Sequence, residues 1–446
     1  MLLKILKKDF NRKKLITVAL FIFIMLPALL ISSGSNMIIE LSNSLNYMFI
    51  QAKVPHFVQM HSGTIDQEAV ERWSHNNELV KSQQAVEMIN IDGTDVYLGD
   101  NTISEANSVM DLSFVKQNDS FDLLLDLENK PIKVLKGEIA VPIYHKQKEE
   151  MKIGDIVRIA HGSFVMEFRV THFVRDAQMN PSIIHSKRFV VHELDYDTLK
   201  RNLGEVEYLI EFQLDDIDRL SNFSSSYESS NLPKTGPSIN YDLFRIINVL
   251  TDSIVAVIVI FVSLLFCIIA VLCLRFTILA SIEEDYREIG VMKAIGIQQR
   301  DIKRIYLVKY VVVAAFAAAL GYVLSLFLSE LFTANILLYM GAAPKSIPGQ
   351  LIPFLASGVI FLIVVLSCMI TLRRFRRISA VEALRSGNTG EAYKNRSFLS
   401  LSRTRFFSTN IFLGLRDVFH RFKMFWLLCF VFFVCTFIII VPINFL

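Results

Sequence analysis

The stretch SIEEDYREIGVMKAIGIQQRDIKRI, Ser281–Ile305, lies between two strongly hydrophobic segments and decides how the rest of the chain is interpreted. Its residues Ile289, Met292 and Ile295 recur every three positions beside charged side chains, which is typical of an amphipathic helix. Gly296 is placed to end that helix, because glycine adopts the left-handed conformation that closes a helix C-terminus. A second amphipathic turn is expected immediately afterwards. We interpret the stretch as a docking surface for another protein, and a solvated loop is the alternative.

The composition indicates a mixed protein. The chain of 446 residues is 52% hydrophobic, which is too apolar for an ordinary soluble protein and too polar for one that lies wholly in a membrane. Five stretches are long and apolar enough to supply the roughly 20 residues that cross a bilayer. The predicted spans are Leu15–Ser32, Ile246–Leu274, Tyr306–Phe332, Leu351–Leu372 and Phe425–Val441.

The first predicted span also has the features of a cleaved signal peptide, since basic residues precede it and small residues follow it. Its apolar run is longer than a usual signal core, and cleavage would spoil the topology that the later spans share. We therefore interpret it as a membrane helix.

Lysine and arginine residues predict the orientation, because basic residues beside a span are retained in the cytoplasm. They gather before the first span, after the second and after the fourth, whereas the loop between the third and fourth has only Lys345. We expect a multi-pass protein of the cell (plasma) membrane with a cytoplasmic N-terminus. The large segment Ser33–Asn240 then faces outward.

The outward segment is predicted to be a mixed α+β domain. Helices are expected at Asp66–Lys81 and Glu193–Leu203, and the serine-rich stretch Asn222–Pro237 is expected to be a flexible return to the membrane. Apolar or alternating runs bounded by turn residues predict strands at Val86–Ile91, Val96–Leu98, Ile139–Ile143, Ile156–Ala160 and Phe164–Val174.

Two further helical features are expected beside the spans. Apolar residues at helical spacing follow the first span and precede the second, so both spans are predicted to extend outward as two stalks. The third span carries the small residues Ala314, Ala318 and Gly321 four or fewer positions apart, and such residues let helices approach closely in lipid. We interpret these three as a helix-packing face instead of a substrate path.

The sequence contains no motif of a catalytic or phosphate-binding site. It has no GxxxxGK[ST] phosphate loop, no HExxH and no GxSxG. Most of its histidines lie in the outward segment without a recognised metal-ligand spacing. We therefore expect no catalytic residue and no metal site on this chain.

Three segments carry a family resemblance. The run Arg287–Gly296, followed by Arg300-Asp301-Ile302, closely resembles the cytoplasmic signature of FtsX-like (MacB/LolC-type) ABC transporter permeases. The run Ile378–Arg385, ISAVEALR, resembles the sequence after the fourth span of that family. The segment Gly137–Ile159, with its Gly154-Asp155 turn, is similar to the MacB-type core domain. Together the resemblance covers most of residues 1–388.

The resemblance implies a membrane α-helical fold of about five transmembrane helices with a large extracytoplasmic α+β MacB-like core domain on helical stalks. The expected domains are 1–33, the N-terminus and first span; 34–245, the extracytoplasmic domain with stalks; 246–388, the FtsX-like permease domain with a coupling loop at 275–305; 389–423, a cytoplasmic linker and amphipathic helix; and 424–446, the fifth span.

In that family the loop after the second span docks on a separate ATPase, and motion passes through the stalks to the exterior domain. ATP and Mg would be bound by the partner ATPase, with no cofactor on this chain. The further implied partners are a second permease copy or a complementary half-permease, membrane lipid and an extracellular partner, with no nucleic acid. The coupling residues so implied are Arg287, Glu288, Ile289, Gly290, Met292, Lys293, Ile295, Gly296, Arg300 and Asp301.

The expected function is therefore that of a permease subunit that exports or extracts an amphipathic substrate, namely a peptide, an antimicrobial or a lipid. A transmembrane signal transducer that controls an extracellular hydrolase or senses a toxin is the alternative from another class. MacB-type permeases stop after four spans, so the fifth is also consistent with half of a two-repeat permease, a variant with an added helix, or a non-functional fragment. The short repeat of Asp9-Phe10 as Asp417-Val418 agrees with a second copy beginning there.

Overall fold

A computed structural model describes residues 14–99, 103–203, 205–344 and 347–373, together with seven residues between 426 and 440. The chain divides into two compact units. The first, the membrane unit, holds Met1–Asn36, Val257–Ser329 and Ile347–Leu446, and the second, the domain unit, holds Met37–Ala256 and Glu330–Ser346.

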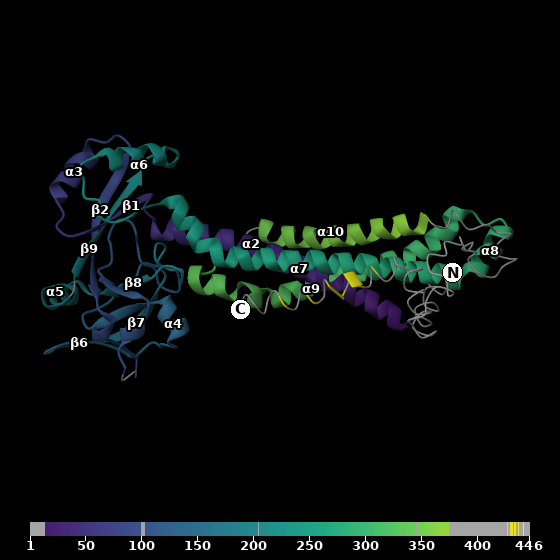
Figure 1. The fold of residues 1–446 in the computed structure, drawn as a ribbon, viewed down its shortest axis with the longest axis horizontal. Helices are drawn as coiled ribbons and strands as arrows, with labels where there is room; N and C mark the ends of the chain where they lie inside the picture. Colours follow the sequence, from purple (N-terminus) through teal and green to yellow (C-terminus); the bar gives the residue numbers. More distant parts are fainter. Residues whose placement is uncertain are drawn as a thin grey trace, which may run out of the picture. The chain divides into compact units, whose positions relative to one another are not determined.

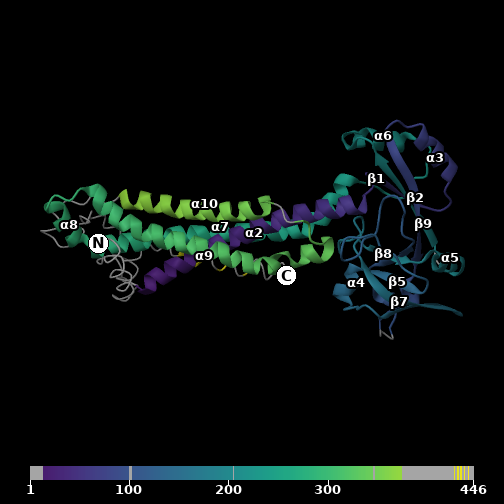
Figure 2. The ribbon, with the colours of Figure 1, turned by 180° about the vertical axis from the view of Figure 1, so that it is seen from behind.

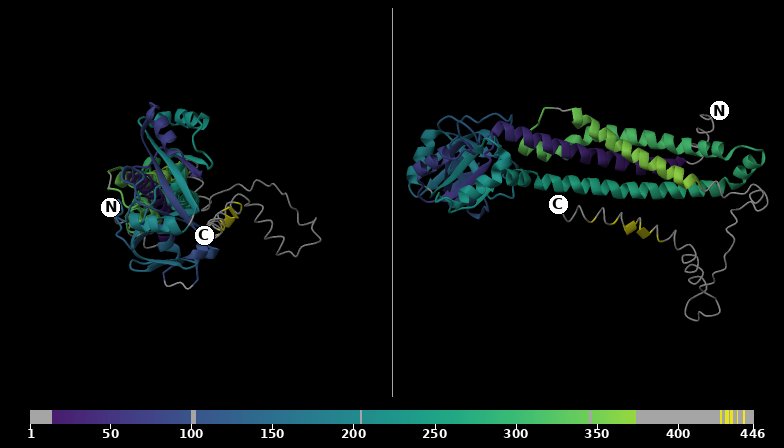
Figure 3. Two further views of the ribbon diagram at one scale, coloured as in Figure 1. Left: turned by 90° about the vertical axis from the view of Figure 1, so that its left-hand side faces the viewer. Right: turned by 90° about the horizontal axis from the view of Figure 1, so that it is seen from above.

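Four helices in the described residues are long and apolar enough to cross a membrane. They are α2 (Lys14–Ala52), α7 (Tyr241–Glu284), α9 (Gln299–Met340) and α10 (Ile347–Thr371), and the short α8 (Tyr286–Ala294) lies between α7 and α9. Figures 1, 2 and 3 show the four long helices side by side. The first four predicted spans are thus confirmed. The run Ile378–Arg385 lies outside the described residues. The fifth predicted span, Phe425–Val441, also lies outside them, apart from the seven single residues between 426 and 440.

Hydroxyl groups link the helices of the membrane unit. The Ser263 hydroxyl donates to the Pro27 carbonyl at 2.9 Å, and the Ser357 hydroxyl donates to the Ala318 carbonyl at 2.9 Å. In lipid the apolar side chains gain little by leaving the solvent, so close packing and such hydrogen bonds hold helices together. The helices therefore associate through small and hydroxyl-bearing residues.

Three helices, not two, continue from the membrane unit into the domain unit. The sequence predicted stalks from α2 and α7, and Leu41, Leu45 and Met48 of α2 are indeed buried at helical spacing. The end of α9 joins the same core through Ile336 and Met340. The predicted span stopped at Phe332 because the polar residues Thr333 and Asn335 follow it. These residues lower the hydropathy of the segment, but the helix continues through them to Met340.

The domain unit is built on a ten-stranded sheet with the order β10-β1-β9-β2-β4-β8-β5-β7-β6-β3. Its neighbours pair antiparallel except β4 with β8 and β5 with β7, which are parallel. The five predicted strands are confirmed in β2, β3, β5, β6 and β7, except that Ile143, predicted to end a strand, begins the helix α4. The strands are β1 Phe57–Ser62, β2 Val80–Ile91, β3 Val96–Leu98, β4 Asp111–Val115, β5 Glu138–Pro142, β6 Ile156–His161, β7 Phe164–Val174, β8 Ser186–Val191, β9 Glu205–Leu214 and β10 Ser238–Asn240.

Four helices pack on this sheet: α3 (Gln67–His75), α4 (Ile143–Lys148), α5 (Glu193–Asn202) and α6 (Leu220–Ser229). Figure 1 shows α3 and α6 together beside β1 and β2. The stretch predicted to be flexible, Asn222–Pro237, therefore begins as a helix, and the prediction was wrong for residues 222–229. Serine-rich composition concealed Leu220, Phe223 and Tyr227, which recur at helical spacing and are buried in one aromatic cluster with β1 and β9.

Candidate functional site

The predicted docking stretch forms α8 and the start of α9, and buried residues fix it to the membrane unit. Tyr286 and Ile289 of α8 are buried in one cluster with Ile302 of α9. The Tyr306 hydroxyl of α9 donates to Asp285 Oδ2 at 2.8 Å, just before α8 begins. The segment is therefore an anchored helix, and not a loop that only joins two spans.

Gly296 ends α8 in the conformation that the sequence predicted. Its φ is +90°, in the left-handed region that favours glycine. The Ile297 amide donates to the Met292 carbonyl at 3.0 Å, and the Gly296 amide donates to the Lys293 carbonyl at 3.1 Å. This pair of bonds is the Schellman motif, which satisfies carbonyls at the end of a helix. The turn lets α9 begin only a few residues later.

The apolar stripe of α8 winds around the helix instead of following one face. Ile289 is fully buried, Met292 is half-buried and Ile295 is 71% exposed. Three residues advance an α-helix by about 300°, so a spacing of three turns the stripe back by about 60° at each step. Ile295, with its exposed neighbours Val291 and Ile297, therefore forms the outward apolar surface, whereas Ile289 anchors the helix.

Charged residues border this outward surface. Glu288 lies in the first turn of α8 and Asp301 in the first turn of α9, while Lys293 lies in the last turn of α8. Acidic residues near a helix N-terminus and basic residues near its C-terminus interact favourably with the helix dipole. Each such interaction stabilises the helix by about 0.3–1 kcal/mol. Burial and the neighbouring Lys303 lower the pKa of Lys293. Of the ten predicted coupling residues, Ile289 and Gly290 are buried, Met292 and Lys293 are half-buried, and Arg287, Glu288, Ile295, Gly296, Arg300 and Asp301 are exposed.

The three small residues of α9 lie inside the membrane unit. Ala314 and Ala318 are buried in its core. Gly321 lies against the backbone of α2, where a Cβ atom would be 2.7 Å from the Met25 carbonyl oxygen and 2.9 Å from the Ala28 Cβ. The close approach of α9 to α2 depends on the missing side chain.

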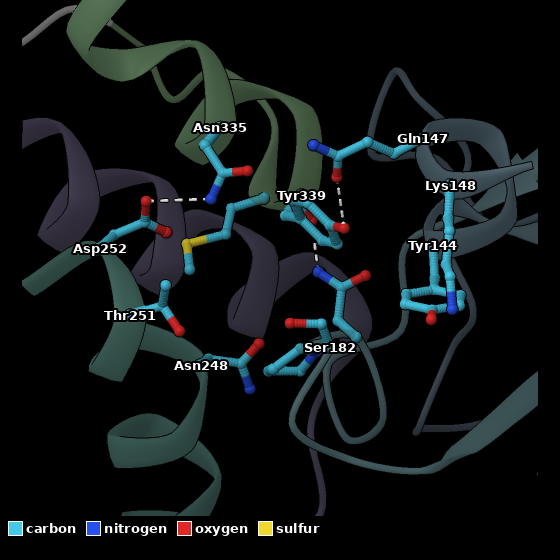
Figure 4. Close-up of a pocket in the computed structure, with 12 residues that line it drawn as sticks. Tyr144, Gln147, Lys148, Ser182, Asn248, Thr251, Asp252, Asn335 and Tyr339 are labelled. Carbon is cyan, nitrogen blue, oxygen red and sulfur yellow. Dashed lines mark hydrogen bonds between the residues drawn. The ribbon is translucent and has the colours of Figure 1, made fainter. Parts of the chain in front are cut away.

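A second candidate site lies wholly in the domain unit, and the sequence analysis missed it. It is a pocket of about 260 Å³ with Asn248, Thr251 and Asp252 of α7 on one side (Figure 4). Tyr144 and Lys148 of α4 lie across from them. The loop after β7 and the last turns of α9 complete the lining. Polar groups from four separate segments therefore meet at one place.

One signal in the sequence could have revealed this pocket. Asn248, Thr251 and Asp252 follow an i, i+3, i+4 pattern at the start of an otherwise apolar helix, so they share one helix face. An ionisable residue near an apolar span is expensive and calls for a partner or a function. The predicted span Ile246–Leu274 included all three without separating them from the apolar residues.

The long apolar helices and the α+β domain inserted between the first two of them define a multi-pass membrane protein. Residues 260–380 match the family described as "FtsX-like permease C-terminal". These residues therefore form a domain of the FtsX-like type, and the resemblance carried by the run Arg287–Gly296 is confirmed. The matched residues contain α8, its Schellman turn and all of α9. FtsX-like permeases are typically non-catalytic membrane subunits that pair with an ABC ATPase.

Among solved structures, the chain is similar to a domain described as belonging to a permease protein from Porphyromonas gingivalis. The identity is 11%, the match covers 39% of this chain and 83% of that one, and the TM-score is 0.24. No curated protein matches this chain.

Proposed function

We propose that this chain is the permease subunit of an ABC transporter that exports or extracts an amphipathic substrate, such as a peptide, an antimicrobial or a lipid. A separate ATPase chain would bind ATP and Mg, and this chain would carry no catalytic residue. The observation that supports the proposal is α8, which is anchored by buried residues and presents charged and apolar residues outward between two long helices.

The continuity of α9 supports a mechanical role. This helix of 42 residues begins directly after the Schellman turn and ends in the core of the domain unit. At 1.5 Å per residue it is about 63 Å long. A displacement of α8 by a partner would reach the start of α9 through the buried cluster that holds both Ile289 and Ile302, and a continuous helix would carry it onward.

The proposal includes an orientation. The basic residues around α8, among them Arg287, Arg300 and Arg304, would lie in the cytoplasm, and the domain unit would face outward. Val291 and Ile295 would enter an apolar groove of the ATPase, with Arg287 and Glu288 fixing the register by charge. A second permease copy or a complementary half-permease would complete the transporter in the plasma membrane.

The test is affinity purification of the tagged full chain from mild detergent, with mass spectrometry of what accompanies it. A stoichiometric ABC ATPase is expected with the wild type. The double variant Glu288→Lys, Gly296→Val should lose it, because it inverts a docking charge and forces valine into a left-handed conformation. Gly162→Val is the control, since Gly162 also has a positive φ, of +57°, but lies between β6 and β7. Equal ATPase recovery with the double variant and the wild type would refute the docking assignment.

A further inference from the structure

The pocket of the domain unit contains two buried amide oxygens without a partner. Asn248 Nδ2 donates to the carbonyls of Ala177 and Phe244 at 2.9 Å, and Asn180 Nδ2 donates to the Tyr339 carbonyl at 2.6 Å. A carbonyl only accepts, so each amide must turn its nitrogen toward these groups and its oxygen away. Both oxygens are buried and have no hydrogen-bond partner in the described part of the chain. A buried acceptor without a donor destabilises the fold, because it gives up its hydrogen bonds to water and gains none in return.

Asp252 brings a carboxylate to the same pocket. The residue is 5% exposed, and Asn335 Nδ2 donates to its Oδ1 at 3.0 Å. No ion pair involves this carboxylate among the residues that the structure describes. Burying a carboxylate is costly unless a cation or several donors offset the lost hydration. One amide donor is a small compensation, so Asp252 itself lacks the cation and the further donors that would offset its burial.

We propose that this pocket binds the primary ammonium group of a basic peptide, either a lysine side chain or an N-terminus. An ammonium carries three donors and one positive charge. Three residues that line the pocket carry acceptors without a matching cation or donor, namely Asp252, Asn180 and Asn248. The inference rests on the proposed function, because it names the chemical group by which the domain unit would recognise an amphipathic peptide substrate.

The size and the opposite side of the pocket agree with this ligand. A volume of about 260 Å³ is below the roughly 300–1,000 Å³ of sites for drug-sized ligands, so one side chain or terminus enters and the rest of the peptide stays outside. Lys148 Nζ lies 5.3 Å from the centre of the Tyr144 ring. Because this cation already occupies the aromatic face, the incoming ammonium is directed to the Asp252 side.

The test is a calorimetric titration of the purified full chain in nanodiscs, without ATPase, at physiological ionic strength. The probes are a tri-lysine peptide and the same peptide acetylated on every amine. Acetylation removes the charge, and we expect it to weaken binding at least tenfold. Asp252→Asn should weaken tri-lysine binding by a similar factor. The matched control is Asp242→Asn, which makes the same change at an exposed residue of α7.

Three outcomes would overturn the site. The first is equal binding of the acetylated peptide and of tri-lysine. The second is wild-type affinity for tri-lysine in Asp252→Asn, with an unchanged melting temperature. The third is heat on titration with sodium or calcium chloride but none with tri-lysine, which would assign the pocket to an inorganic cation. Because no ATPase takes part, such a failure leaves the permease proposal intact. Conversely, selective binding of tri-lysine by a chain that recovers no ATPase would retain the site and refute the proposed function.

Discussion

The Arg175 guanidinium donates from Nε to the Leu338 carbonyl at 2.9 Å and from Nη2 to the Leu337 carbonyl at 2.8 Å. These carbonyls lie in the last turn of α9, where a helix leaves carbonyls without partners and carries partial negative charge. Asn129 Nδ2 adds a bond to the Met340 carbonyl at 3.1 Å. Burial lowers the pKa of Arg175 to about 10, so it remains a cation at neutral pH. The domain unit thus holds the C-terminal end of α9, the helix that follows α8 in the chain.

Arg175→Met should loosen this attachment, because methionine fills part of the same space but donates no hydrogen bond. Each hydrogen bond of a charged group is worth about 1.5–3 kcal/mol, so we expect amide hydrogen exchange in residues 330–344 to accelerate at least tenfold. Mass spectrometry of the full chain measures it. Arg219→Met is the control, since Arg219 is 62% exposed and forms a long ion pair with Asp216. Unchanged exchange in Arg175→Met would mean that the core of the domain unit alone holds α9.

Gly321→Ala should destabilise the membrane unit. The added Cβ would lie 2.7 Å from the Met25 carbonyl oxygen, so α9 and α2 would have to separate. Overpacking of this kind costs about 1–3 kcal/mol. Thermal unfolding of the full chain in one detergent should show a lower melting temperature.

Gly358→Ala is the matched control for this substitution, because it adds the same methyl group to another membrane helix. Nothing lies within 4 Å of its Cβ position. Alanine also has the higher helix propensity, so the melting temperature of this variant should stay equal or rise. If both variants behaved alike, the approach of α9 to α2 would not depend on the missing side chain.

Local signals explain why α8 was predictable from the sequence. Its end depends on Gly296 alone, and its anchoring residue Ile289 belongs to a short periodic pattern. The direction in which each apolar residue points was less accessible, because a spacing of three does not distinguish an inward Ile289 from an outward Ile295. That distinction comes from packing, because Ile289 shares a buried cluster with residues of α7 and α9.

The pocket and the hydrogen bonds from Arg175 to the end of α9 depend on contacts between segments that are distant in the sequence. Arg175 and Leu338 are far apart in the sequence, and nothing in the residues near Arg175 marks it as a helix-capping group. The sequence does not show that the side-chain oxygens of Asn180 and Asn248 lack donors, because this depends on the carbonyls that their amide nitrogens face in the fold. Likewise, α6 formed because Phe223 and Tyr227 meet an aromatic cluster, which overrides the weak helix preference of its serines.

Arg188→Met should strongly destabilise the domain unit. Arg188 is fully buried, with Nη1 2.6 Å from Asp122 Oδ2 and Nη2 2.5 Å from Asp176 Oδ1. Removing the cation leaves two buried carboxylates with only neutral donors, such as the Gln178 and Met179 amides that donate to Asp176, and breaking such a pair costs about 3–5 kcal/mol. Lys200→Met is the comparison, since its ion pair with Glu87 is partly exposed and worth at most about 1 kcal/mol. Chemical denaturation should separate the two variants, and similar midpoints would contradict the assigned role of Arg188.

His145 should make the stability of the domain unit depend on pH. Burial, together with the charges of Lys187 and Lys148, lowers the pKa of this ring from 6.5 to about 3. Between these pH values the unfolded chain binds a proton that the folded chain does not, so stability is complete above pH 6.5 and is lost as the pH falls toward 3. The loss is about 1.4 kcal/mol per pH unit in that window, or about 2 kcal/mol at pH 5.

His145→Phe removes the titrating ring and should therefore escape this loss. Between pH 7.5 and pH 5, the wild type should lose about 2 kcal/mol more of its free energy of unfolding than His145→Phe loses. Denaturant unfolding at the two pH values measures it, and the exposed His75→Phe should keep the wild-type profile. Parallel profiles for His145→Phe and the wild type would show that the ring stays accessible to protons in the folded chain.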